Sequence, residues 1–140
     1  MKIYLAYKQT WIDKNKLKQE LSFLKEILEQ NWKNKVFIYF FDWDSNLPPE
    51  KLNNNFLNEI ETSDLIVWYI NYPEKSEWQL LELWMAYALN KKILILINDS
   101  VKDKYYLVYW LGKVINFKNL IDLKKLLNNQ QLNNNYLGNK

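Results

Sequence analysis

The chain has 140 residues, the size of one domain with its own hydrophobic core. Its 19 basic and 16 acidic residues give a formal net charge of +3 and are interleaved, so no basic stripe indicates nucleic-acid binding. The absence of Cys and His excludes disulfides, thiol catalysis, His-based triads and the usual zinc ligand sets. General acid–base chemistry would therefore use Asp, Glu, Lys or Tyr.

Neither an export signal nor a membrane span is apparent. Met1–Ala6 lacks the apolar core and cleavage site of a signal peptide, and Asn90–Lys92 interrupts the longest apolar run before it could span a bilayer. We therefore expect a cytoplasmic protein that does not bind membranes. Seven Trp and ten Tyr exceed what a core of this size normally holds, which predicts a self-association face and a homo-oligomer, a dimer or larger.

Short apolar runs alternate with helical patterns along the whole chain. In order, we expect a strand at Lys2–Tyr7, a helix at Asp13–Asn31, a strand at Val36–Phe41, a helix at Glu50–Thr62, a strand at Leu65–Ile70, a helix at Trp78–Asn90, strands at Ile93–Ile97 and Lys113–Phe117, and a helix at Leu120–Leu127. Apolar strands alternating with helices predict an α/β fold, a flavodoxin-like or Rossmann-like doubly wound parallel sheet of about five strands with helices on both faces. This single domain is expected to span 1–127, and the Asn-rich segment 128–140 is expected to be a disordered tail.

One carboxylate stands out within the third expected helix. Glu82 is the only charged residue between Trp78 and Asn90, and apolar residues cover almost every face of that helix. A buried carboxylate loses much of its hydration energy, and no cation lies one turn away to compensate. Two interpretations stay open: an ion pair with another segment, for instance with Lys8, or a pocket that holds Glu82 for chemistry.

In doubly wound sheets, ligands bind outside the carboxyl ends of the strands. Those ends carry Tyr7–Gln9, Asp42–Asp44, Asn71–Ser76 and Asn98–Ser100. Ser76 can cap the helix that contains Glu82, and the backbone N–H groups there would receive an anion such as phosphate. Asp64 precedes its strand, at the opposite end of the sheet, and is interpreted as a turn residue.

Several segments occur in a recognisable order and spacing. They are Ile3–Ala6, Ser63–Val67, Ser76, Glu82–Leu83, Ala86–Ala88 and Lys91–Ile93. Over roughly Lys2 to Ile97 they resemble the nucleoside 2-deoxyribosyltransferase family, and within it the 2'-deoxynucleoside 5'-phosphate N-hydrolases. The resemblance implies a flavodoxin-like enzyme that cleaves or exchanges the N-glycosidic bond of a 2'-deoxynucleotide or deoxynucleoside, without a cofactor or a metal.

The same resemblance implies roles for individual residues. Glu82 would be the nucleophile that attacks the anomeric carbon, and Tyr4 would orient it. A carboxylate can carry a deoxyribosyl group as a covalent intermediate, which water hydrolyses or a second base captures. Ser76 would bind a 5'-phosphate, which favours a nucleotide over a nucleoside. The other expected substrate-binding residues are Lys8, Asp42 and Trp78.

The chain departs from the family pattern at several positions. Phe56 stands where the family has an Asp, and Asp42 is a candidate to replace that acid. Residues Tyr7, Trp78 and Trp84 stand where glycines are usual, and a Trp in place of Gly narrows or remodels a pocket. Two alternatives therefore remain beside the leading one: a TIR-like domain that cleaves NAD, and a nucleotide-binding or protein-interaction module without catalysis.

Overall fold

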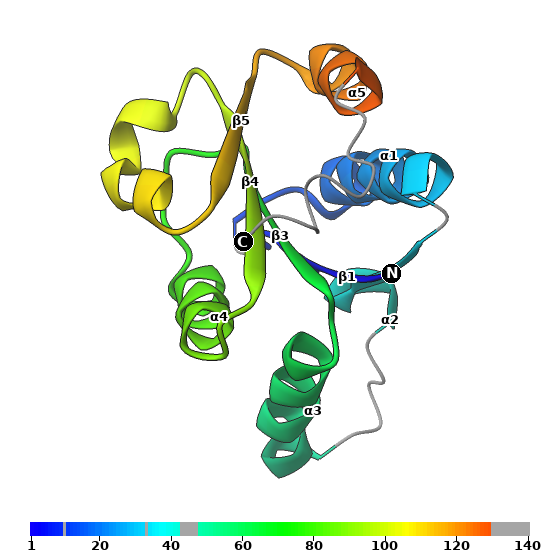
Figure 1. Cartoon of the computed structure of the whole chain (residues 1–140), viewed down its shortest axis with the longest axis vertical. Coiled ribbons are helices and arrows are strands. Elements are labelled where there is room, and N and C mark those ends of the chain that lie inside the picture. Colours follow the sequence, from blue (N-terminus) through cyan, green and yellow to red (C-terminus); the bar gives the residue numbers. More distant parts are fainter. Residues whose placement is uncertain (10, 33, 43–47, 130–140) are drawn as a thin grey trace.

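The computed structural model describes residues 1–9, 11–32, 34–42 and 48–129. Within these residues, five parallel strands form one sheet in the order β2-β1-β3-β4-β5 (Figure 1). The strands are β1 (Lys2–Ala6), β2 (Lys35–Ile38), β3 (Leu65–Ile70), β4 (Lys92–Asn98) and β5 (Lys113–Phe117). This confirms the predicted doubly wound, flavodoxin-like fold, whose strand order reverses between β1 and β3.

Helices cover both faces of the sheet. The helices are α1 (Lys14–Trp32), α2 (Tyr39–Asp42), α3 (Pro49–Glu61), α4 (Glu77–Ala88) and α5 (Leu120–Asn129), with short 3-10 helices η1 (Lys102–Lys104) and η2 (Tyr106–Trp110). Helices α1 and α5 lie on one side of the sheet, and α3 and α4 lie on the other (Figure 1). All six residues of β3 are therefore buried, as the continuous apolar run predicts.

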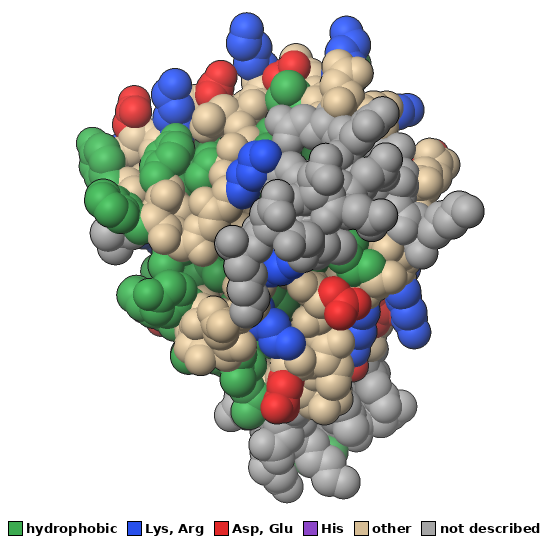
Figure 2. All heavy atoms as spheres, viewed as in Figure 1, with side chains coloured by type: hydrophobic (Ala, Val, Ile, Leu, Met, Phe, Trp, Pro, Cys, Tyr) green, Lys and Arg blue, Asp and Glu red, His purple; other side chains and the backbone are tan. Residues whose placement is uncertain are grey.

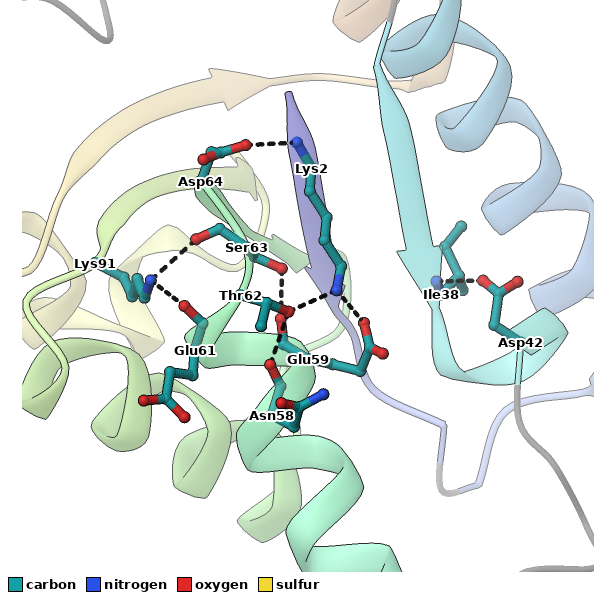
Figure 3. A network of polar contacts seen from close by, with 10 residues as sticks. All are labelled: Lys2, Ile38, Asp42, Asn58, Glu59, Glu61, Thr62, Ser63, Asp64 and Lys91. Atoms are coloured by element: carbon teal, nitrogen blue, oxygen red, sulfur yellow. Dashed lines mark hydrogen bonds and ion pairs between the residues drawn. The ribbon is translucent and has the colours of Figure 1, made fainter.

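The structure differs from the sequence expectation after the second strand. We expected a strand through Phe41, but β2 ends at Ile38 and the chain turns into α2. The Asp42 carboxylate accepts a hydrogen bond from the Ile38 backbone N–H at 2.8 Å (Figure 3). Such a local side-chain contact competes with the strand ladder, and a short apolar run alone does not separate strand from helix. Neither η1 nor η2 was expected.

The third expected helix also ends earlier than its apolar pattern. Helix α4 stops at Ala88, and Asn90 has a φ of 55°, in the left-handed region. Asn tolerates this conformation better than most residues, and it commonly ends helices. The chain then turns sharply into β4.

A polar network joins the amino ends of β1 and β3, opposite the carboxyl ends of these strands (Figure 3). The Lys2 backbone N–H donates to the Asp64 carboxylate at 2.7 Å, and the Lys2 ammonium lies 2.7 Å from Glu59. From the other side, the Lys91 ammonium donates to the Ser63 carbonyl at 3.1 Å. Asp64 is thus a turn residue, as predicted.

Helix α5 continues to Asn129, two residues into the segment expected to be a tail, and 130–140 lie outside the described residues. Among the helices in the described ranges, none combines the length and hydrophobicity of a membrane span. The cytoplasmic location stays a prediction.

Part of the aromatic surplus lies on the surface. Apolar side chains gather along the edge of the molecule where η2 and α4 lie (Figure 2). Among the side chains that the structure describes, the large exposed apolar ones of these two elements are Trp78, Leu81, Trp84, Tyr87, Tyr106, Tyr109 and Trp110.

Candidate active site

The structure brings together the two residues that were predicted to act in catalysis. Tyr4 points to the α3 and α4 side of β1, because alternate residues of a strand face opposite sides of the sheet. Its hydroxyl donates a hydrogen bond to Oε2 of Glu82, in the second turn of α4. Tyr4 is fully buried and Glu82 is 4% exposed. The contact joins a central strand to the helix that begins at the carboxyl ends of β1 and β3.

The alternative ion pair between Glu82 and Lys8 does not form. The Lys8 ammonium instead lies 3.6 Å from the carboxylate of Glu74. A phenol therefore compensates the buried carboxyl group, in place of the cation that was considered. A phenol stabilises a carboxylate less than an ion pair would, because it brings no positive charge.

Burial controls the ionisation of this pair. It raises the pKa of Glu82 to about 8, although the hydrogen bond from Tyr4 lowers it in part. Burial, followed by the charge of Glu82, also raises the pKa of Tyr4 well above its ordinary value. Glu82 is thus mostly protonated at pH 7 and becomes a nucleophilic carboxylate as the pH passes about 8. A perturbed carboxyl group at this edge of the fold marks a candidate site.

Two more tyrosines lie within the electrostatic reach of Glu82. Burial and then the charge of Glu82 raise the pKa of Tyr39 to about 12. Tyr7, whose pKa burial also raises above its ordinary range, has a buried hydroxyl near the Phe40 backbone. That hydroxyl makes no well-formed hydrogen bond within the part of the chain that the structure describes. Beside Tyr4, two more phenols thus lie close enough to Glu82 for its charge to affect them.

Aromatic rings occupy the place of the acid that the family resemblance implies. The Phe56 ring lies 4.7 Å from the Tyr39 ring and 4.8 Å from the Trp78 ring, between centroids. Asp42, the candidate replacement, is exposed and accepts the Ile38 N–H, as described above. No contact among the described residues joins Asp42 to Glu82.

A pocket of about 560 Å³ opens beside the start of α4. It brings together three of the predicted substrate-binding residues, Lys8, Ser76 and Trp78. The Ser76 hydroxyl accepts a hydrogen bond from the Gln79 backbone N–H at 3.3 Å, so Ser76 caps the helix as predicted. Trp11 and Lys75 line the same pocket and were missed. The sequence did offer a signal for both, because Trp11 follows the first strand and Lys75 is next to Ser76.

Buried polar residues hold the start of α4 at the point where the strand order reverses. The Gln79 side chain donates to the Tyr69 carbonyl at 2.8 Å and lies 3.5 Å from the Ala6 carbonyl. These carbonyls belong to the carboxyl ends of β3 and β1. Sequence reasoning missed Gln79, although an uncharged polar residue in so apolar a helix was a signal.

Hydrogen bonds to Tyr72 hold the loop that leads to Ser76 from both faces of the sheet. On the α1 side, the Tyr72 hydroxyl donates to the buried Glu20 carboxylate at 2.9 Å. On the other side, the Tyr105 hydroxyl donates to the Tyr72 carbonyl at 3.0 Å. Glu20 was also missed, although it interrupts the apolar stripe of α1 three residues after Leu17.

The described residues contain no group of three acidic side chains that could hold a metal ion. The groups found near Glu82 are the phenols of Tyr4, Tyr39 and Tyr7. A carboxylate in this setting can attack an electrophilic carbon, and a neighbouring phenol can hold it in place.

No protein-family model matches the sequence, and no curated protein matches it either. Solved structures do match. A CMP N-glycosidase of Clostridium botulinum has 20% identity and a TM-score of 0.70, with 91% of this chain and 97% of that chain covered. A conserved protein of Enterococcus faecalis has 16% identity and a TM-score of 0.67, with 92% and 98% covered.

A third structure is a 2-deoxyribosyltransferase of Bacillus psychrosaccharolyticus, with 18% identity and a TM-score of 0.61, covering 89% of this chain and 90% of that chain. At such identities, the likeness concerns the fold. The chain therefore has the fold of a CMP N-glycosidase and of a 2-deoxyribosyltransferase, which confirms, at the level of the fold, the resemblance inferred from its sequence.

Proposed function

We propose that this protein cleaves or exchanges the N-glycosidic bond of a 2'-deoxynucleotide or deoxynucleoside, with Glu82 as the nucleophile. The observation that carries the proposal is the buried hydrogen bond from Tyr4 to Glu82, where the strand order of the sheet reverses. The names of two structures with the same fold, an N-glycosidase and a deoxyribosyltransferase, support glycosyl chemistry of this kind.

In the first step, a Glu82 carboxylate oxygen attacks C1' of the sugar. The bond from C1' to the base nitrogen breaks, its electron pair stays with the base, and the base takes up a proton from solvent water. Tyr4 keeps the other carboxylate oxygen in place, because its hydroxyl donates to Oε2. In the second step, water or another base attacks C1' and gives up a proton to the solvent, while the bond from C1' to the Glu82 oxygen breaks and its electron pair returns to the carboxylate.

The pocket beside α4 supports a phosphorylated substrate. The Ser76 hydroxyl and the first N–H groups of α4 can donate to a 5'-phosphate, and Lys8 supplies positive charge. Trp78 reaches from this pocket to Phe56, and so lies between the expected phosphate position and the aromatic rings near Glu82.

The test is chromatography of the purified protein after incubation with candidate substrates. These are the four 2'-deoxynucleoside 5'-monophosphates, CMP, the matching nucleosides with a free acceptor base, and NAD. Glu82→Gln is run in parallel, because it keeps the shape of the side chain and removes the nucleophile. Base released by the wild type and not by Glu82→Gln is the expected result.

Two other outcomes separate the alternatives. Consumption of NAD with no action on deoxynucleotides would favour the TIR-like reading. No turnover of any substrate, together with a rise in melting temperature on adding a nucleotide, would indicate a binding module.

We also propose that the protein self-associates through the apolar side chains of α4 and η2. Trp84, Tyr87 and Trp110 are exposed there, and aromatic residues are enriched at protein interfaces (Figure 2). Light scattering after size exclusion should give a mass above one chain, and Trp84→Glu should lower it. A monomeric mass for the wild type at micromolar concentration would refute this part.

A further inference from the structure

The pocket beside α4 is larger than one phosphate requires. We call it the lysine–tryptophan pocket, after Lys8, Lys75, Trp11 and Trp78 in its lining. Its volume of about 560 Å³ lies within the range of sites that hold whole small molecules. Neither Glu82 nor Tyr4 lines it. A phosphate at Ser76 would leave most of this volume for another part of the ligand.

Two lysines, Lys8 and Lys75, place positive charge along the lining of the pocket. Lys8 is only 8% exposed, yet its counter-charge among the described residues is Glu74, at 3.6 Å and itself exposed. A buried ammonium is stabilised by close hydrogen-bonded anions, which this arrangement lacks. The Lys75 ammonium lies 5.7 Å from the centre of the Tyr105 ring, a cation–π contact that restrains its side chain. The pocket thus offers two cations on different segments, an arrangement that matches the two singly charged phosphates of a pyrophosphate.

Two tryptophans supply surface on which a base can stack. Trp11 is 95% exposed, although it is among the largest apolar side chains of the chain. Its φ of 67° lies in the left-handed region, which bulky residues rarely adopt. Trp78 is also exposed in the same lining. Exposed aromatic rings next to cations are the usual means of holding a base and its phosphate.

The lining of the pocket also contains one acidic side chain, Glu77. Glu77 lies in the first turn of α4 and is exposed. A carboxylate repels phosphate, but it accepts hydrogen bonds from the hydroxyls of a ribose. The pocket therefore presents groups for a phosphate, a ribose and a base, the parts of a second nucleotide.

We infer that the lysine–tryptophan pocket binds the second nucleotide of a dinucleotide, in which two nucleosides are joined by a 5'–5' pyrophosphate. The first nucleotide then places its N-glycosidic bond at Glu82. The inference rests on the proposed function for the position of the first phosphate at Ser76. The two lysines contact the pyrophosphate, and Trp11 stacks on the second base.

The test is calorimetric titration of full-length Glu82→Gln, which prevents turnover. Two ligand pairs differ by the second nucleotide: NAD against NMN, and P1,P2-di(adenosine-5') pyrophosphate against AMP. In each pair the dinucleotide should bind about tenfold more tightly or better, whichever base faces Glu82. Adenylyl-3',5'-adenosine, which has a single phosphate, should lack this gain.

Variants test which side chains are responsible for the tighter binding of the dinucleotide. Trp11→Ala should lower the affinity ratio between NAD and NMN by about fivefold or more, and Lys75→Gln should weaken the salt dependence of NAD binding. Ile121→Ala is the control, since Ile121 is 69% exposed on α5 and lies outside both the pocket lining and the proposed self-association surface. Equal affinities within both pairs, an unchanged ratio in Trp11→Ala, or an equal gain with adenylyl-3',5'-adenosine would each overturn the inference.

The two proposals fail separately. Wild-type protein that releases base from mononucleotides, but shows no gain for dinucleotides, refutes the inference about the pocket alone. A dinucleotide gain that depends on Trp11, without base release from any substrate, refutes the role of Glu82 alone.

Discussion

Replacing Glu82 by Gln should make the protein more stable at high pH. Burial raises the pKa of Glu82 from 4.5 to about 8. Between these values the folded state holds a proton that the unfolded state has lost, so the free energy of unfolding falls as the pH rises. Gln has a similar shape and no ionisation, so the variant escapes this loss.

The magnitude follows from the size of the pKa change. A difference of about 3.5 pH units, at about 1.36 kcal/mol each, amounts to about 5 kcal/mol between pH 4.5 and pH 8. Glu82 is 4% exposed, so screening by solvent reduces this free-energy difference only a little. Most of the loss should already be present at pH 7, and the free energy of unfolding should level off above pH 8. Relative to the wild type, Glu82→Gln should gain several kcal/mol over this range.

Urea unfolding at pH 5, 6, 7, 8 and 9 measures the difference between the two proteins. Subtracting one curve from the other removes the titration of groups that they share. Glu61→Gln, at an exposed site, is the control and should follow the wild type. If the curves of wild type and Glu82→Gln run parallel from pH 5 to pH 9, the carboxyl group is not held protonated by burial and the reasoning is wrong.

Three further predictions concern activity. Tyr4→Phe removes the donor that lowers the pKa of Glu82, so the midpoint of the pH profile of kcat/KM for base release should rise by about one to two pH units; an unchanged midpoint would mean that Tyr4 does not act on the carboxylate. Phe56→Asp supplies an acid for the leaving base and should raise kcat by about a hundredfold if a missing acid limits the rate, measured as base release from a nucleotide; no gain would show that Phe56 leaves no such gap. Tyr105→Phe unclamps the loop before Ser76, so KM for a phosphorylated substrate should rise at constant kcat, with about 1 kcal/mol of stability lost in urea; a fall in kcat alone would contradict a positioning role.

Most of the fold was predictable because its signals are local. The three inner strands, β1, β3 and β4, are continuous apolar runs, since helices cover both faces, and the alternation with helices implies parallel pairing. The end of β2 was predicted wrongly, because the Asp42 contact that ends it does not alter the apolar pattern of Val36–Phe41. The 3-10 helices η1 and η2 are short and have no periodicity that a sequence pattern could reveal.

The sequence by itself determined that Glu82 would be a buried carboxyl group and that Ser76 would cap its helix, because both follow from residues within one or two turns. Only the tertiary structure decided what Glu82 meets. Tyr4 is 78 residues away, and it reaches Glu82 because α4 packs across β1 with the Tyr4 side chain on that face. The lysine–tryptophan pocket arises in the same way, from loops that the parallel sheet brings to one edge. Contacts between distant segments depend on how the elements pack, and local residue patterns do not encode which side chains that packing joins.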